Sequence, residues 1–388
     1  MSGLTLLACG LAAPTASLAL SEPSAAVQAP ADPDLAERTA LGREFAGLLL
    51  SSLDYRATAI AKLRANPTTA TLLRMRPDWS DLLLKTADEA VQEETPIAEG
   101  MMGDALASNI PLDELRLGVE FFKTPAGGEF IRAIGEKESG KPITPLSDNA
   151  KKELTAFSKS AKGADFMVRL AETGKLLAPT MAKSYTLIAA KFLRRFGEKS
   201  EAIERSRLAN LPPDNAAQLL AIRLIRDTHY MKYFKQGASR GVDQASAEQA
   251  IPGHPELTSA VGSSMVEAID IDETEITRLI GRDLAQSYSE EELRADVAFL
   301  ESPSGQALVA ARDVKFSGHK PRPFTQKQTL AINRFASTTH GAAFFKKVKL
   351  TDEAATQAEP EYLPLITATC MRLAGESLAK SSALPSVS

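Results

Sequence analysis

The sequence predicts an all-α protein, and three observations lead to this prediction. Only 6% of the 388 residues are aromatic, and the chain is rich in alanine, leucine, glutamate, lysine and arginine, which favour helices over sheets. Apolar residues recur at helical spacing, and helix-capping signals precede several of these segments. With 44% apolar residues, the chain has enough hydrophobic side chains to give more than one domain a core.

A long internal repeat indicates two homologous halves. Residues 77–130 align with residues 255–308 without a gap, and 13 of the 54 aligned positions are identical. About three or four identities are expected from ordinary composition. We interpret the halves as duplicates, each a helical bundle. The predicted domains are a signal peptide and linker rich in proline, alanine and serine (1–34), two helical repeat domains (35–205 and 206–376) and a disordered tail (377–388).

A shorter repeat lies inside each half. The pattern F-x-x-[ST]-x-x-G-x-x-[FL] occurs four times, beginning at Phe121, Phe157, Phe299 and Phe335. The Ser or Thr that follows Phe by three residues is a preferred helix N-cap. In two copies a proline comes next, at the first helical position, where a missing N–H costs nothing. The pattern therefore predicts a helix, a sharp corner and a second helix.

The helices that lead into these corners also carry start signals. Ser289 with Glu292, and Thr325 with Gln328, have the S/T-x-x-E/Q spacing of a capping box. Ser147 has the same place in a third copy, whereas the first copy has proline there. We expect helices to begin after these residues.

The repeated glycines Gly127, Gly163, Gly305 and Gly341 are predicted to lie in the first turn of each second helix. Glycine in a helix is less favourable than alanine by about 1 kcal/mol, so another factor must favour it. Either the corner brings another backbone too close for a side chain, or the free amides bind an anion. Four copies favour the packing interpretation, because four identical ligand sites would be unusual.

Coarser patterns predict the remaining helices. The basic amphipathic stretch Tyr185–Arg195 is interpreted as core on one side and solvated on the other, with contact to an anionic membrane as the alternative. The predicted segments are opening helices at 42–65 and 216–236, paired helices at 77–106 and 255–284, closing helices at 179–195 and 362–373, and a linker at 196–214.

The first residues are typical of an export signal. Residues 4–13 are apolar and small, no charge precedes residue 22, and residues 21–34 are rich in alanine, proline and serine. Small residues at alternate positions place the predicted cut after Ala19 or Ala29. We therefore expect a periplasmic or secreted protein.

The two cysteines have different expected roles. Cys9 ends a lipobox-like sequence, but a cysteine inside the signal core is the favoured interpretation. After cleavage Cys370 would be the only cysteine left, in apolar surroundings, so we expect a buried structural thiol and no intramolecular disulfide.

Composition and motifs argue against several functional classes. A net charge of -4 gives no basic excess for nucleic acid, and past the signal no apolar run approaches the ~20 residues of a transmembrane helix. The four histidines lie far apart, so neither a metal site nor a cofactor is predicted, and no residue is assigned a catalytic role. Four weaker patterns are interpreted as structural or coincidental: the acidic run 270–275 as a helix start, Ser377–Lys380 and Ser147–Asn149 as chance matches to penicillin-binding motifs, and the Glu93–Glu94 pair as solvated surface.

The second half resembles a known bacterial family. Its E-E-L at 291–293, followed by Phe299, Ser302, Pro303 and Gly305, is similar to the family catalogued as domain of unknown function 2059. The match covers residues 257–348 clearly and 82–169 more weakly. Leu300 stands where that family has an aromatic residue, whereas the first half keeps Phe122. The resemblance implies a helical fold and export in Gram-negative bacteria, and it implies no chemistry.

These observations favour an exported, soluble, non-catalytic binding or interaction module of unknown partner, either a protein or another component of the cell envelope. The first alternative is a membrane-surface or lipid-binding helical protein with peripheral membrane contact. The second is a helical enzyme with a site between the two halves. A ligand-sized pocket is the feature that would distinguish among them.

Overall fold

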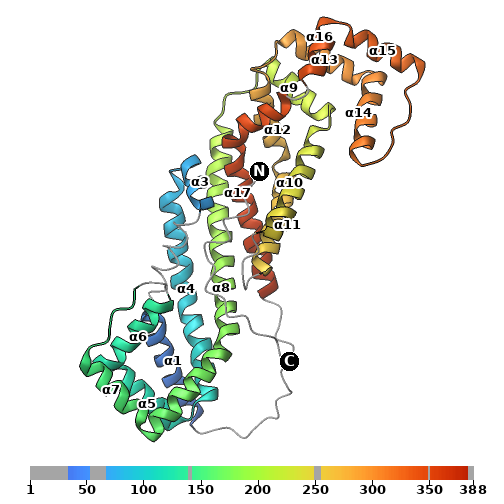
Figure 1. Ribbon diagram of the computed structural model, residues 1–388. Coiled ribbons are helices and arrows are strands. Elements are labelled where there is room, and N and C mark those ends of the chain that lie inside the picture. Colours follow the sequence, from blue (N-terminus) through green and yellow to red (C-terminus); the bar gives the residue numbers. More distant parts are fainter. Residues whose placement is uncertain (1–33, 53–66, 139–141, 249–254, 348–349, 383–388) are drawn as a thin grey trace. The chain divides into compact units, whose positions relative to one another are not determined.

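The computed structural model describes residues 34–52, 67–138, 142–248, 255–347 and 350–382, and these ranges contain helices and no strand (Figure 1). The all-α prediction is confirmed. The predicted signal and nearly all of its linker, and residues 383–388, lie outside the described residues. The helices are α1 (Leu35–Ser52), α3 (Pro67–Met75), α4 (Trp79–Asn109), α5 (Leu112–Phe122), α6 (Pro125–Glu138), α7 (Asp148–Lys159), α8 (Ala161–Ala209), α9 (Ala216–Asp227), α10 (Tyr230–Glu248), α11 (Pro255–Ile271), α12 (Glu273–Leu284), α13 (Glu290–Glu301), α14 (Pro303–Phe316), α15 (Gln326–Ala336), α16 (Thr339–Lys347) and α17 (Leu350–Ser382).

The described chain divides into two compact units. Helices α8, α11 and α17 each contribute to both units, so each unit holds segments from both halves of the sequence. The boundary predicted at 205/206 falls inside α8. Unit 1 contains residues 197–248, 261–347 and 350–373, and unit 2 contains residues 34–52, 67–138, 142–196, 255–260 and 374–382.

Several predicted elements differ from the structure. The opening helix expected at 216–236 is two helices, α9 and α10, and residues 53–65 of the one expected at 42–65 lie outside the described residues. The linker expected at 196–214 is helical as far as Ala209, because charged pairs one turn apart support the helix and the prolines begin only at Pro212. The tail expected from residue 377 is helical to Ser382, because Leu378 is buried. The pair of helices expected at 77–106 is the single helix α4, which continues through Pro96, whereas the second half has the separate helices α11 and α12.

All four predicted corners are present, and they share one hydrogen-bond pattern. The hydroxyl of the capping Ser or Thr accepts a hydrogen bond from the glycine N–H three residues later, at 3.0–3.2 Å, and donates one to the phenylalanine carbonyl three residues earlier, at 2.6–2.7 Å. The helix starts at Ser289 and Thr325 have complete capping boxes, and Ser147 caps α7. These caps confirm the local predictions.

The repeated glycines are small because the corner itself leaves no room. A Cβ on Gly127, Gly163, Gly305 or Gly341 would lie 1.9–2.3 Å from the carbonyl oxygen of the phenylalanine six residues earlier. Heavy atoms do not approach this closely without a bond, and the obstacle is backbone rather than a flexible side chain. The packing interpretation of the glycine is therefore confirmed.

Aromatic stacks join consecutive corners within each unit. In unit 2 the rings of Phe121 and Phe157 stack with centroids 4.1 Å apart, and in unit 1 those of Phe299 and Phe335 stack at 3.9 Å. The core of unit 2 continues from this stack to Phe45 and Phe166, both fully buried. The shorter repeat thus places one ring of each corner against the next.

Helices α8 and α17 make the same close contact in each unit. In unit 1 a Cβ on Gly197 would lie 2.3 Å from the nitrogen of Arg372, and in unit 2 a Cβ on Gly375 would lie 2.3 Å from the nitrogen of Arg194. Gly197 corresponds to Gly375, and Arg194 to Arg372, in the register that aligns residues 77–130 with residues 255–308. Glycine allows both helix backbones to approach closely.

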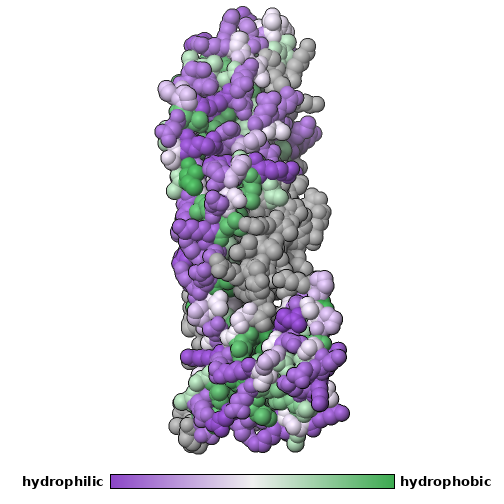
Figure 2. Space-filling view, turned by 90° about the vertical axis from the view of Figure 1, so that its left-hand side faces the viewer, coloured by the Kyte–Doolittle hydropathy of each residue, from purple (hydrophilic) through white to green (hydrophobic). Residues whose placement is uncertain are grey.

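Within the ranges that the structure describes, no helix is both long and apolar enough to cross a membrane. The face drawn in Figure 2 is mostly hydrophilic, with hydrophobic residues scattered among polar and charged ones.

Candidate functional site

Unit 1 contains a hollow of about 650 Å³ between α9, α10 and the first turns of α12. Its floor is apolar and consists of Ile222, Ile225 and Met231, of which the last two are buried. The volume lies within the range of roughly 300–1,000 Å³ that is typical of small-molecule sites. The sequence contained no motif that indicated this hollow.

The rim of the hollow carries opposite charges on two walls. The end of α9 and the start of α10 contribute Arg226, His229 and Lys232. The end of α11 and the start of α12 contribute Asp270 and Glu273, followed by the hydroxyl groups of two threonines at 274 and 277. The hollow thus combines apolar residues with a basic and an acidic set of side chains, and the basic set is paired with Asp227 and Asp313.

His229 turns the chain from α9 into α10. Its φ of 52° lies in the left-handed region, where residues other than glycine are uncommon. Its backbone N–H donates to the Arg226 carbonyl at 2.9 Å, and its Nδ1 lies 2.9 Å from Oδ2 of Asp313. Such backbone conformations persist only where neighbouring groups hold them, and they cluster at functional sites.

Asp313 of α14 holds the cationic wall in place. Besides His229, its carboxylate accepts a hydrogen bond from the Tyr233 hydroxyl and lies 3.4 Å from Nζ of Lys232. Burial raises the pKa of Asp313, but the hydrogen bonds from Tyr233, His229 and Lys232 outweigh it, so its pKa is lowered overall. The carboxylate therefore stays ionised and stabilises the positive charge of this wall.

The acidic wall has more negative charge than its cation neutralises. Lys235 forms ion pairs with both Asp270 and Glu273, and its Nζ lies 2.6 Å from Oε2 of Glu273. Burial lowers the pKa of Lys235, but these two carboxylates outweigh it and the pKa is raised. Two carboxylates share one ammonium group, so this wall attracts a further cation.

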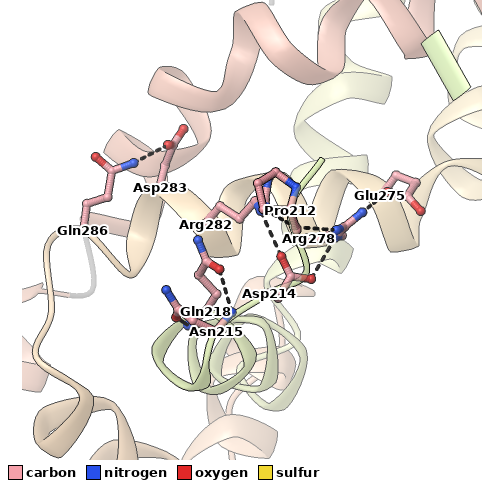
Figure 3. Close-up of polar contacts among 9 residues, drawn as sticks. All are labelled: Pro212, Asp214, Asn215, Gln218, Glu275, Arg278, Arg282, Asp283 and Gln286. Carbon is pink, nitrogen blue, oxygen red and sulfur yellow. Dashed lines mark hydrogen bonds and ion pairs between the residues drawn. The ribbon is translucent and has the colours of Figure 1, made fainter. Parts of the chain in front are cut away.

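A clamp of arginines fixes α12, the helix that carries the acidic wall. Figure 3 shows Arg278 and Arg282 directed at the Asp214 carboxylate, with Nε–oxygen distances of 2.7 and 2.9 Å. Both arginines also donate to the Pro212 carbonyl. Asn215, also drawn there, begins α9 with a capping box. The segment between α8 and α9 is thereby tied to α12.

Tyrosines beside the hollow are expected to resist ionisation. Burial, followed by the hydrogen bond to Asp313, raises the pKa of Tyr233 to about 12, and burial together with Asp352 also raises that of Tyr230. Between the ordinary pKa of 10.0 and these values, the unfolded chain loses protons that the folded chain keeps. Stability should therefore fall as the pH rises above about 10. A phenolate absorbance titration checks the raised tyrosine pKa values. Tyr233→Phe should remove a step near pH 12 and leave the earlier part of the titration unchanged.

The structure also places the other residues that sequence patterns had marked as notable. The acidic run at 270–275 spans the end of α11 and the start of α12, so only its later part is the expected helix start, with Glu273 and Glu275 in the first turn of α12. Cys370 is buried, as predicted, and this burial raises the pKa of its thiol to about 12. Ser377 and Lys380 lie on α17. In the part of the chain that the structure describes, no three His, Cys, Asp or Glu side chains are grouped to hold a metal ion.

The prediction for the Glu93–Glu94 pair is wrong for Glu94. Only 2% of the Glu94 side chain is exposed, and it forms an ion pair with Lys191 of α8, while Glu93 accepts two hydrogen bonds from Arg195 at 2.6 and 2.9 Å. These two basic residues of the stretch at 185–195 are therefore engaged with α4 inside unit 2. Phe192, on the other side of this stretch, is buried, which fits the interpretation of one core face.

Comparisons with models of protein families, with curated proteins and with solved structures found no match for this chain. The resemblance of the second half to domain of unknown function 2059 thus stays a prediction.

Proposed function

We propose that the chain is a non-catalytic binding protein whose ligand site is the hollow of unit 1. The proposed ligand is a small zwitterion with an apolar side chain, namely an amino acid or a short peptide. The observation that carries this proposal is the pairing of a cationic wall and an acidic wall over an apolar floor.

Each part of such a ligand has a counterpart in the hollow. A ligand carboxylate fits the wall of Arg226 and Lys232, where it shares these cations with Asp227 and Asp313 and gains charge-assisted hydrogen bonds. A ligand ammonium group fits Asp270 and Glu273, which share the ammonium group of Lys235. An apolar side chain gains from contact with the floor, because it leaves water there.

The compartment is part of the same proposal. The apolar segment at 4–13 and the cut expected after Ala19 or Ala29 support export, to the periplasm or beyond the cell. A short peptide from a protein, or from another envelope component, is a ligand that an exported binding protein would meet. The alignment of residues 77–130 with residues 255–308 supports the further proposal that the chain arose by duplication.

Calorimetric titration with chemically matched probes tests the ligand class. We expect leucine or leucyl-leucine to bind, and the N-acetylated and the amidated form of the same probe to bind at least about tenfold more weakly, since each lacks one charged contact. Glu273→Gln should weaken binding of the zwitterion and of the amidated form, and Lys232→Gln that of the zwitterion and of the acetylated form. Lys152→Gln, in unit 2, is the control. Equal binding of all forms, or no binding of either zwitterion, would contradict the proposal.

A further inference from the structure

A basic segment without acidic residues lies in the second half of the chain. Residues 314–350 contain eight lysines and arginines and no aspartate or glutamate, although the whole chain has a net charge of -4. The corresponding segment of the first half, 136–172, contains seven basic and six acidic residues. The excess of positive charge is therefore specific to residues 314–350 and is not shared by the corresponding segment of the first half.

The structure places the described part of this segment at one end of unit 1, over the last turn of α14, the loop after it, α15 and α16 (Figure 1). Five of its basic side chains are exposed: Lys315, Lys320, Arg322, Lys327 and Arg334. None of the five forms an ion pair with a carboxylate of the described residues. This distinguishes them from the basic residues of α8, which are held by Glu93 and Glu94.

Large apolar side chains are exposed on the same segment. Phe316, Phe324 and Phe345 are 41%, 36% and 40% exposed, and no other phenylalanine in the described ranges is counted among the exposed large hydrophobic residues. Leu330 of α15 is 63% exposed, the highest value among the large hydrophobic residues whose exposure the structure describes. Helix α15 has no buried side chain, although its sequence is amphipathic. Its apolar face is thus only partly covered by its own unit.

We propose that this basic end, defined as the exposed side chains of residues 314–345, docks on an anionic phospholipid surface. Aromatic and aliphatic side chains enter the interfacial region of a bilayer while lysines and arginines contact its anionic headgroups. A nucleic acid would also attract the cations, but its bases bind proteins by stacking on aromatic rings. Leu330, an aliphatic residue that is 63% exposed, has no ring on which a base could stack. The inference is independent of the hollow and its ligand.

Vesicle flotation of the full chain tests the proposal. We expect the protein to float with vesicles of phosphatidylcholine and phosphatidylglycerol, to stay behind with phosphatidylcholine alone, and to be released by salt, which screens the charges. The double variant Lys320→Glu/Lys327→Glu should reduce binding to the anionic vesicles at least about tenfold. Leu330→Ser should weaken it without any change of charge, which separates membrane contact from simple ion attraction.

The control is Lys152→Glu/Lys159→Glu, which changes the net charge equally at exposed positions of α7 in unit 2. It should bind like the wild type. Circular dichroism checks that all variants keep their helices. Equal loss in both double variants, no loss in Lys320→Glu/Lys327→Glu, or equal binding to neutral vesicles would overturn the proposal. Binding of a single-stranded oligonucleotide with no vesicle binding would also overturn it.

Discussion

Gly305→Val is expected to lower the melting temperature of the protein clearly, by a loss of stability near the upper end of the roughly 1–3 kcal/mol that overpacking usually costs. A Cβ at this position would lie 2.1 Å from the Phe299 carbonyl oxygen and 2.5 Å from Cα of Leu300. Both atoms belong to the backbone, so no side chain can rotate away. Thermal melts of the variant and the wild type measure the difference. Two results would contradict the packing account. One is a variant as stable as the wild type, and the other is a rise in melting temperature with phosphate that the wild type shows and the variant lacks.

Neighbouring glycines in α6 provide a matched comparison. A Cβ on Gly127 would lie 2.3 Å from the Phe121 carbonyl oxygen, whereas a Cβ on Gly128 would meet nothing within 4 Å. Gly127→Ala should therefore destabilise unit 2. Gly128→Ala should stabilise it by up to about 1 kcal/mol, because alanine favours the helix. Effects of the same sign and size would show that helix propensity, rather than the corner, determines the outcome.

Lys191→Met is the second substitution for which we expect a large loss of stability. It should reduce the stability of unit 2 by roughly 3–5 kcal/mol, because it leaves the buried Glu94 carboxylate without its cation. The Lys191 side chain is 31% exposed, so water moderates the loss and the lower end of this range is expected. Denaturant unfolding measures the change, and Lys151→Met is the control, because Lys151 pairs with a fully exposed Asp148 side chain and should matter little.

The double variant Glu94→Gln/Lys191→Met isolates the buried charge. It should recover most of the stability lost in Lys191→Met, because a neutral amide costs less to bury than a carboxylate. If the double variant is as unstable as the single one, the loss comes from packing around Lys191 and the ion pair has little part in it.

The corners were predictable because their signals are local. A capping hydroxyl, a proline at the first helical position and a glycine three residues after the cap each act within one turn, so the pattern beginning at Phe299 predicted the observed hydrogen bonds. The all-α fold class was predictable from equally local signals, since helix propensity and amphipathic spacing are properties of short segments.

Long-range features were not predictable in the same way. Glu94 is buried only because α8 packs on α4, and nothing in its own neighbourhood in the sequence indicates this. The hollow likewise depends on residues of α9, α10, α11 and α12 that come together only in the fold. One signal was available but was missed: Gly197 and Gly375 occupy corresponding positions of the two halves, beyond the aligned stretch.

A methyl-detected NMR titration with leucine and with leucyl-leucine tests most directly whether a zwitterion binds in the hollow of unit 1. The signals of Ile222, Ile225 and Met231, which form the floor, should shift and saturate together, while those of Ile188, in the core of unit 2, stay in place. The same titration on Glu273→Gln should need more ligand to reach the same shift. Floor signals that do not move while either ligand binds, or shifts at Ile188 of equal size, would contradict the proposal.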